Sequence, residues 1–280
     1  MIIENAIKNR ISETSGSSLF IRNVLKEELQ NFVLNFIYTS KYKNLIFTGG
    51  TCLRKNYGLN RLSEDLDFDF VDEFDIDQFA ENVIEYFQKT LEYRLVTAKI
   101  STNRQSIYLK FPILKELGLL GNQGTPEDLF LRCDFSKINT KIYGTETNLI
   151  KAGQYEFFNL SYDLPTLFAN KIVATIERIY FKGKYQKVSS KGRDIYDIFW
   201  LLQLSAKTSF SLKPNKERML KLLKLNSSLE IKSLLKKKIN LVEEDYLYQD
   251  LLPLLESKGL IDSFKQNFKK DILQKIEFVL

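Results

Sequence analysis

The sequence contains no histidine and only two cysteines among its 280 residues. Without histidine there can be no Ser-His-Asp triad, no Cys-His dyad, no His-ligated zinc and no histidine general base. Any chemistry must therefore come from carboxylates, lysine, arginine, hydroxyl groups and a bound metal ion. The cysteines, Cys52 and Cys133, have the spacing of neither a disulfide framework nor a metal site, so we expect buried thiols in a reducing, cytoplasmic compartment.

Long apolar runs are also absent. No stretch approaches the roughly 18 consecutive apolar residues of a membrane-spanning helix, so no membrane partner is expected. The apolar share of 44%, with 21 Phe and 14 Tyr, is nevertheless enough for a sizeable core, which excludes global disorder. The length is that of one large domain or two ordinary ones.

The hydrophobic periodicity changes along the chain and predicts a mixed α/β (α+β) fold followed by helices. Strands are predicted at 44–48, 65–71, 93–100, 105–111, 129–135 and 154–159. Helices are predicted at 17–39, 51–57, 76–89, 164–181, 193–204, 214–225, 229–239 and 257–278. After Leu164 the strands are expected to stop, and 182–191 is expected to be a polar loop. We therefore expect an α/β domain over 1–162 and a helical domain over 163–280.

The feature that points most directly to chemistry is a Gly-Gly-Thr turn followed by alternating acids. Asp65 and Asp67 lie two apart in a predicted strand, so their carboxylates point to the same side. Adjacent carboxylates repel unless a divalent cation lies between them, and Mg²⁺ (or Mn²⁺) binds carboxylates together with substrate phosphates. Upstream, Gly49 and Gly50 let the backbone approach a phosphate, and Thr51 opens a helix whose free N–H groups favour an anion. Together these features predict a nucleotide site, whereas a solvated edge strand after an ordinary turn is the simpler alternative.

A third acid would complete a two-metal site. The candidate is Asp134, a lone acid in the otherwise apolar strand predicted at 129–135. If this strand neighbours the strand of Asp65 and Asp67, its carboxylate joins theirs as a metal ligand. If it does not, Asp134 is a strand-end residue that faces solvent.

The compound pattern at 49–68 resembles the AbiEii/AbiGii toxin family of nucleotidyltransferases, within the DNA polymerase β superfamily. The pattern is Gly49-Gly50-Thr51, then Arg61-x-Ser63-x-Asp65-Leu66-Asp67-Phe68. The resemblance spans about residues 45 to 205 and implies a polymerase-β-like domain that uses a nucleoside triphosphate. Family members are typically toxins of toxin–antitoxin or phage-defence pairs, and some transfer nucleotides to the 3′ end of tRNA. The resemblance therefore implies an RNA (tRNA) acceptor and a cognate antitoxin.

Two later segments match the family in the same order. Lys171 stands where the family carries a phosphate-binding lysine, and the segment from Arg193 to Ile198 resembles its Arg-Asp-x-x-Asp helix. From the residues alone, Lys171 either points into a cleft or extends to water from an apolar helix, and Asp194 either acts in the site or complements the helix dipole. We also expect Asp194 to orient the acceptor or Lys171. The predicted catalytic residues are Asp65, Asp67, Lys171 and Asp194, and the predicted nucleotide-binding residues are Gly49, Gly50, Thr51, Arg61, Ser63 and Lys171.

Two other functions compete with this interpretation. Asp67 and Asp69 resemble the nucleophile strand of haloacid-dehalogenase-like phosphatases, although that motif leaves the Gly-Gly turn unexplained. A non-catalytic nucleotide-binding interaction protein is the other alternative. Arg54, one turn into the predicted helix at 51–57, is expected at the surface in each case.

The chain is basic towards its C-terminal part. Residues 207–238 contain ten Lys and Arg and two Glu, a net charge of 10 − 2 = +8 against +6 for the whole chain. Such asymmetry suits a helical domain that holds a polyanion near an acidic centre. The simpler alternative is a solvated face of a Lys-rich helix pair.

Overall fold

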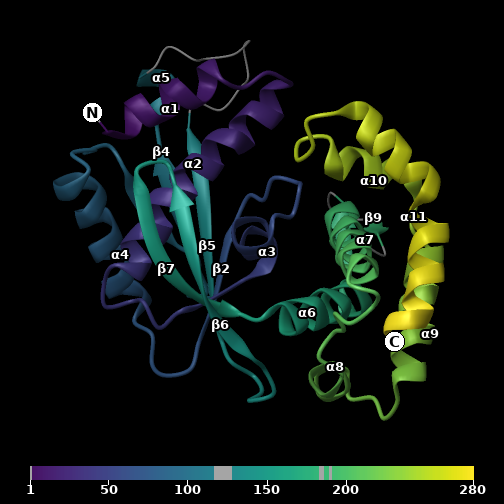
Figure 1. Cartoon of the computed structure of the whole chain (residues 1–280). Helices are drawn as coiled ribbons and strands as arrows, with labels where there is room; N and C mark the ends of the chain where they lie inside the picture. The colour runs from purple at the N-terminus through teal and green to yellow at the C-terminus, as the bar shows by residue number, and fades with distance from the viewer. Residues whose placement is uncertain (1, 117–127, 183–185, 189–190) are drawn as a thin grey trace. The chain divides into compact units, whose positions relative to one another are not determined.

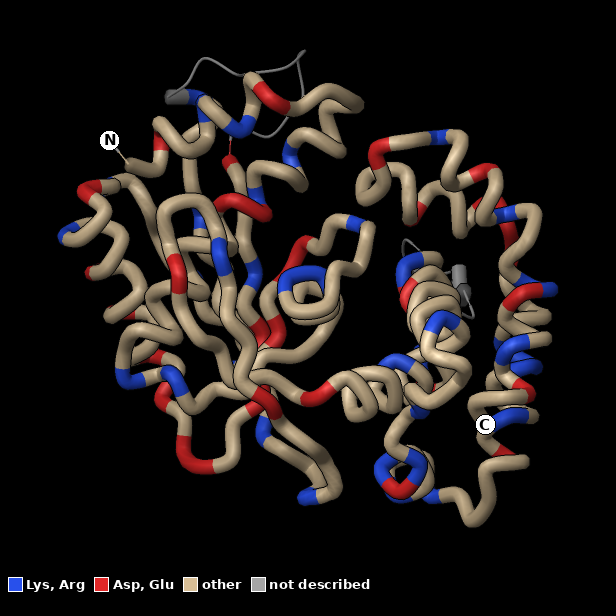
Figure 2. The backbone as a smooth tube through the Cα atoms, viewed as in Figure 1, with Lys and Arg blue, Asp and Glu red and all other residues tan. Residues whose placement is uncertain are grey.

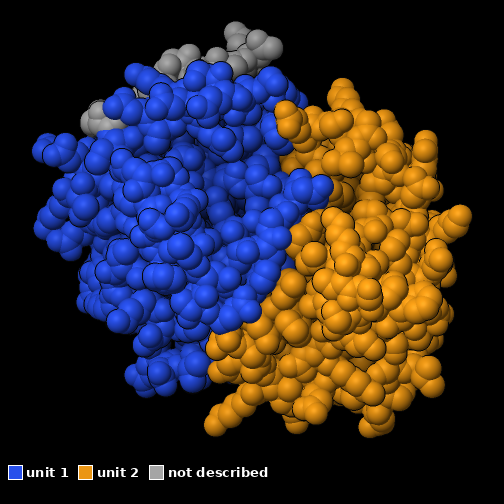
Figure 3. Space-filling view, in the orientation of Figure 1, with its two compact units in different colours: residues 1–138, 146–161 blue, residues 139–145, 162–280 orange. Residues whose placement is uncertain are grey.

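The structure is a computed structural model that describes residues 2–116, 128–182, 186–188 and 191–280. The chain forms two compact units (Figure 3). Unit 1 comprises residues 1–138 and 146–161, and unit 2 comprises residues 139–145 and 162–280.

Unit 1 is built on a mixed sheet of seven strands in the order β3-β4-β5-β2-β1-β7-β6 (Figure 1). The strands are β1 (Ile46–Thr48), β2 (Leu66–Phe70), β3 (Thr97–Ile100), β4 (Ser106–Phe111), β5 (Leu129–Lys137), β6 (Thr145–Ala152) and β7 (Tyr155–Tyr162). β2 pairs antiparallel with β1 and parallel with β5, while β1 pairs parallel with β7. The predicted mixed α/β class is confirmed. Strand β6 has no clear signal in the sequence, because only two of its eight residues are buried and its apolar pattern is weak.

The strands form because apolar and polar residues alternate along them. In β5 the buried residues are every second one from Leu129 to Phe135, so one face of the strand is apolar. Phe47, Phe68 and Phe135 stack across β1, β2 and β5 on this face, with ring centroids 5.4 and 5.7 Å apart. Phe79 of helix α4 (Ile76–Glu85) lies edge-on to Phe135 at 4.9 Å, so this helix covers the apolar face.

The helices of unit 1 are α1 (Ile2–Ser12), α2 (Ser18–Tyr38), α3 (Gly49–Tyr57), α4 (Ile76–Glu85) and α5 (Ile113–Glu116). Ser17 caps α2 by accepting a hydrogen bond from the Phe20 N–H at 3.2 Å. The predicted helix 76–89 is α-helical only to Glu85 and continues as a π-helical turn, Tyr86–Thr90.

Unit 2 is mainly helical. Its elements are α6 (Leu164–Glu177), β8 (Tyr180–Lys182), β9 (Gln186–Val188), α7 (Gly192–Lys207), α8 (Lys216–Leu223), α9 (Ser228–Asn240), α10 (Glu244–Leu251) and α11 (Lys258–Val279). The expectation that strands stop after Leu164 is wrong. Arg178 turns to an extended conformation at the end of α6, and a short antiparallel hairpin of β8 and β9 follows. α10 was not predicted because its buried residues are a single pair, Leu247 and Leu251.

Helix α6 packs against α7, α8 and α9, and α7 packs against α10 and α11. Asp163 caps α6 by accepting a hydrogen bond from the Thr166 N–H at 2.9 Å. Within the part of the chain that the structure describes, no helix is long and apolar enough to cross a membrane.

Candidate functional site

Three predicted site acids lie on one face of the unit 1 sheet. In the parallel pairing of β2 with β5, Asp67 is the direct partner of Asp134, and paired residues project from the same face. Asp65 precedes Asp67 by two residues and shares its side, while Leu66 and Phe68 are buried on the other. The strand of Asp134 therefore does neighbour that of Asp65 and Asp67. We call this side of the sheet the acidic face.

The electrostatics of nearby groups agree with this clustering. Burial raises the pKa of the Cys133 thiol well above its usual range, and the carboxylates of Asp134, Asp65 and Asp67 raise it further. Burial acts to lower the pKa of Arg132, but Asp134, Tyr108 and Asp65 outweigh it, so the pKa lies above its ordinary value. The three carboxylates are thus close enough to act on the same neighbours.

Asp134 is engaged by side chains of its own sheet. Its Oδ1 atom accepts hydrogen bonds from the Ser106 hydroxyl at 2.5 Å and from Arg132 Nε at 2.8 Å. The Arg132 guanidinium also lies over the Tyr108 ring, 5.7 Å from its centroid. Any metal that Asp134 binds must therefore compete with Arg132 for the carboxylate.

The Gly-Gly turn approaches these acids so closely that side chains are excluded. Gly49 has φ +80°, and a Cβ atom there would lie 1.9 Å from Asp67 Oδ2. A Cβ atom at Gly50 would lie 2.8 Å from Arg61 Nη2 and 2.9 Å from Ser63 Oγ. The turn therefore brings its backbone into contact with the side chains of Asp67, Arg61 and Ser63.

The side chain of Thr51 connects α3 to β2. Thr51 is fully buried, and its hydroxyl donates a hydrogen bond to the Asp65 carbonyl at 2.5 Å. Thr48, the N-cap residue of α3, makes no side-chain capping hydrogen bond. Thr51 thus fixes the first turn of α3 against the start of the acidic strand, and only its backbone N–H remains suited to a ligand.

An ion-pair network supports the loop between α3 and β2. Arg54 pairs with Glu27 through two contacts, of which Nη2 to Oε2 measures 3.1 Å. Arg54 also donates to the carbonyls of Leu59 and Arg61, each at 3.2 Å. The expectation that Arg54 is a surface residue is therefore wrong, because its partner Glu27 comes from a distant helix, α2. Arg61 itself is only 2% exposed, so it acts from within the structure.

The candidate residues of unit 2 form two ion pairs with α7. One joins α7 to α6, and the other joins α7 to the residue that ends α6. Lys171 Nζ lies 2.6 Å from Asp197 Oδ2, and Arg178 Nε lies 3.0 Å from Asp194 Oδ2. Both aspartates are buried. The expectation that Asp194 orients Lys171 is not met, because the lysine pairs with the other aspartate of the Arg-Asp-x-x-Asp motif, one helical turn further on.

The basic residues of 207–238, whose positions along the backbone are blue in Figure 2, divide into structural and exposed ones. Arg218 is 3% exposed and donates to Asn170 and to the Ile142 carbonyl. Lys232 and Lys236 both pair with Glu277 of α11. The exposed members are Lys207, Lys213, Lys216, Lys221, Lys224 and Lys237. Part of the predicted polyanion surface is therefore internal to unit 2.

The donor set of the acidic face suits a hard divalent cation, because carboxylate oxygens are the ligands that Mg²⁺ and Mn²⁺ prefer. The close approach of the Gly49 backbone to Asp67 places the carboxylate next to the Gly-Gly turn. Outside the gaps at 117–127, 183–185 and 189–190, no three His, Cys, Asp or Glu side chains form a metal-binding group. The residues fit a metal held jointly with a substrate phosphate better than an all-protein cage.

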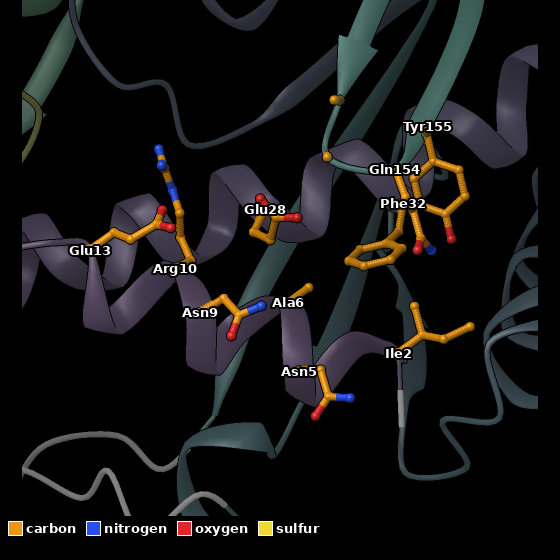
Figure 4. A pocket seen from close by; sticks show the side chains of 12 residues that line it. Ile2, Asn5, Ala6, Asn9, Arg10, Glu13, Glu28, Phe32, Gln154 and Tyr155 are labelled. Atoms are coloured by element: carbon orange, nitrogen blue, oxygen red, sulfur yellow. The ribbon is translucent and has the colours of Figure 1, made fainter.

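Unit 1 also contains a cavity of about 500 Å³ that includes none of the predicted site residues (Figure 4). It lies between α1, α2 and the turn that joins β6 to β7. Arg10, Glu13 and Glu28 line it together with Phe32 and Tyr155. Burial raises the pKa of Glu28. The cavity is therefore separate from the chemistry of the acidic face.

Comparisons with known proteins identify a family for the chain and a similar fold among solved structures. The sequence model of one family, described as "Nucleotidyl transferase AbiEii toxin, Type IV TA system", matches residues 36–238. Among solved structures, the chain is similar to MenT4, a nucleotidyltransferase toxin from Mycobacterium tuberculosis, with TM-score 0.54 and 14% identity over 99% of this chain and 88% of that one. JHP933 from Helicobacter pylori matches with TM-score 0.48 and 18% identity over 94% and 95% of the two chains. No curated protein matches the chain significantly.

Proposed function

Because the chain belongs to the AbiEii nucleotidyl transferase toxin family of type IV toxin–antitoxin systems, we propose that it moves a nucleoside monophosphate from a nucleoside triphosphate to an RNA 3′ end. The acceptor we propose is tRNA, and the reaction requires Mg²⁺ or Mn²⁺. The domain over 1–162 carries the catalytic acids, and the helical domain over 163–280 assists. A cognate antitoxin is the expected protein partner.

One observation carries this proposal: Asp65, Asp67 and Asp134 share a sheet face on which the Gly49 backbone contacts the Asp67 carboxylate. Phosphoryl transfer needs little covalent chemistry from a protein, because positioning and charge neutralisation supply most of the catalysis. An acidic metal site beside a phosphate-binding turn provides both. The phosphatase alternative is less well supported, since its motif belongs to a parallel doubly wound sheet and β2 here pairs antiparallel with β1.

Asp65 and Asp67 would hold the metal, with Asp134 as the third ligand. When bound, the metal neutralises phosphate charge and makes an acceptor hydroxyl easier to deprotonate. The backbone N–H groups of Gly50 and Thr51, at the start of α3, would bind the triphosphate. The protein thus holds the phosphates on one side of the acids through its backbone.

Arg61 and Ser63 assist the turn from the side opposite the solvent. Both side chains lie against Gly50, so a positive charge and a hydroxyl stand directly behind the phosphate-binding backbone. Gln30 donates to the Ser63 carbonyl at 2.8 Å and fixes this loop. We assign Arg61 a fixed electrostatic role, and Ser63 a role in positioning the Gly50 backbone for the triphosphate.

For the second domain the proposal rests on the motifs. Lys171, with its side chain 14% exposed, would bind the triphosphate, and Asp197 would hold its ammonium group in place. Asp194 would orient the acceptor. The exposed lysines of 207–238 would contact RNA phosphates without regard to sequence.

The test is incubation of the protein with each α-labelled nucleoside triphosphate, Mg²⁺ or Mn²⁺, and total bacterial tRNA. We expect label in RNA with the intact protein and none with Asp67→Ala. The matched control is Asp69→Ala, which changes the next acid of the same strand and should retain transfer. EDTA should abolish the signal.

Each other outcome identifies a different function. Label on a protein rather than on RNA would keep nucleotidyl transfer and replace the acceptor. Release of free phosphate that depends equally on Asp67 and Asp69 would support the phosphatase. Nucleotide binding without any turnover would leave a non-catalytic binding protein.

A further inference from the structure

The acidic face continues beyond the acids into a hollow of about 590 Å³ over β3, β4 and β5. Thr97 and Lys99 of β3 pair with Lys110 and Tyr108 of β4, and Lys110 pairs with Phe130 of β5. Paired residues share a face, so these five side chains project from one side of the sheet. We call them the β3–β5 hollow. Their face is also that of Asp134, because Phe130 and Asp134 are four residues apart in the same strand.

Two aromatic rings of this hollow are accessible. Phe130 is 45% exposed although it lies in the interior strand β5. Tyr108, on the neighbouring strand, is half-buried and carries the Arg132 guanidinium 5.7 Å from its ring centroid. Exposed aromatic rings on a sheet are platforms on which unpaired nucleic-acid bases stack.

The charge of the hollow favours an anion. The described residues that line it include Lys99 and Lys110 and no carboxylate. Lys110 Nζ pairs with Asp128 at 2.9 Å, so Lys99 is the lysine of this hollow that makes no ion pair within the described part of the chain. A backbone phosphate beside a stacked base would find a cation there.

The hollow is continuous with the candidate catalytic acids. The Arg132 guanidinium lies over the Tyr108 ring of the hollow and also donates a hydrogen bond to the Asp134 carboxylate at 2.8 Å. Asp134 is in turn the strand partner of Asp67. A chain laid over Tyr108 and Phe130 would thus lead directly to the acids, within unit 1.

The geometry points to the β3–β5 hollow as the binding surface for the unpaired 3′-terminal nucleotides of the RNA acceptor. Bases would stack on Phe130 and Tyr108, Lys99 would contact a phosphate, and the terminal hydroxyl would reach the acidic face. This inference rests on the proposed function and adds the acceptor's location and the residues that select a single-stranded end.

The test separates RNA binding from transfer. A 5′-fluorescein-labelled single-stranded RNA of about ten nucleotides is titrated by fluorescence anisotropy, without nucleoside triphosphate or metal. Phe130→Ala and Tyr108→Ala should each weaken binding about tenfold. Phe158→Ala is the matched control, since Phe158 is an exposed phenylalanine, 64% accessible, on β7 of the same sheet. It should leave binding unchanged.

The salt dependence of RNA binding tests the role of Lys99. Lys99→Ala should reduce the slope of log K against log salt by about 0.7, the value for one phosphate contact with a single strand. Lys151→Ala, an exposed lysine on β6, is its control. In the transfer assay, Phe130→Ala should raise KM for RNA while leaving KM for the nucleoside triphosphate unchanged.

The two hypotheses fail separately. Active wild-type protein whose RNA binding is the same in Phe130→Ala and Phe158→Ala would overturn the inference and leave the proposed function. RNA binding that depends on Phe130, in a protein that transfers nothing, would support the hollow and overturn the function. Failure of the wild-type protein to bind single-stranded RNA, with label transferred to another acceptor, would also overturn the inference.

Discussion

The two units use aspartate in opposite ways. In unit 2, Asp194 and Asp197 are buried, and each lies within ion-pair distance of a cation. In unit 1, Asp65, Asp67 and Asp134 gather on one sheet face, where Arg132 pairs with Asp134. One unit matches buried carboxylates with cations of its own, whereas the other concentrates partly exposed carboxylates.

This difference separates stability from function. A buried carboxylate paired with a buried cation is costly to remove, because its partner is left uncompensated. A cluster of like charges lowers stability and persists where a ligand requires it. The same substitution, aspartate to asparagine, should therefore have opposite consequences in the two units.

The largest expected effect is on activity in unit 1. Asp67→Asn should lower transfer at least about 100-fold, because it removes a metal-binding charge from the acidic face. Its melting temperature should be unchanged or higher, since one of the repelling charges is lost. Asp69→Asn serves as the control and should behave as wild type in both assays. A large loss of stability in Asp67→Asn would mean that the acids of unit 1 are structural as well.

In unit 2 the same kind of substitution should mainly lower stability. Asp197→Asn leaves the Lys171 ammonium without its charged partner and should cost about 3–5 kcal/mol, seen as a fall in melting temperature. Asp262→Asn, at an exposed aspartate of α11, is the matched control. If instead KM for the nucleoside triphosphate rises while the melting temperature holds, the pair serves the substrate more than the fold.

Glu27 tests whether the loss of stability on neutralising an acid depends on its ion pairs rather than on the unit in which it lies. It lies in unit 1 but resembles the acids of unit 2: burial acts to raise its pKa, but Arg54, Lys55 and Arg10 outweigh burial and lower the pKa. Its stabilisation is therefore present above the ordinary glutamate pKa and is lost as pH falls towards the lowered one. Glu27→Gln should cost about 3 kcal/mol at pH 7 and reduce the acid sensitivity of unfolding.

The adjacent Glu28 provides the control of opposite sign. Burial raises the pKa of Glu28, so its contribution to the stability of the fold is greatest at low pH and is lost as pH rises. Glu28→Gln should therefore be neutral or stabilising at pH 7. Thermal unfolding of both variants is measured at pH 7 and at pH 4. Equal destabilisation by the two substitutions would contradict this assignment.

The sequence was sufficient where a signal is local. Strict alternation located β2, a mostly apolar segment located β5, and the spacing of apolar residues located α2. The hairpin of β8 and β9 was missed because its few residues follow directly from a helical pattern. Short elements with few buried side chains depend on tertiary pairing, which periodicity does not report.

The candidate site shows the same limit. That Asp65 and Asp67 share a side followed from their spacing, whereas the neighbourhood of Asp134 depended on a strand order that no local pattern contains. The partners of Arg54 and Lys171 lie 27 and 26 residues away in the chain. Sequence reasoning identified the charged residues, but only the fold determines which charge each one meets.

The smallest expected effect concerns Arg132, the cation that pairs with Asp134 on the acidic face. Arg132→Gln releases Asp134 from its 2.8 Å contact. The Mn²⁺ concentration for half-maximal transfer should then fall about fivefold, roughly 1 kcal/mol. Because Arg132 also acts on Asp65, the measurement is repeated in an Asp134→Asn background. If the gain disappears there, Asp134 is the third ligand; if it persists, Arg132 acts only by repelling the metal from Asp65 and Asp67, and Asp134 serves to hold Arg132.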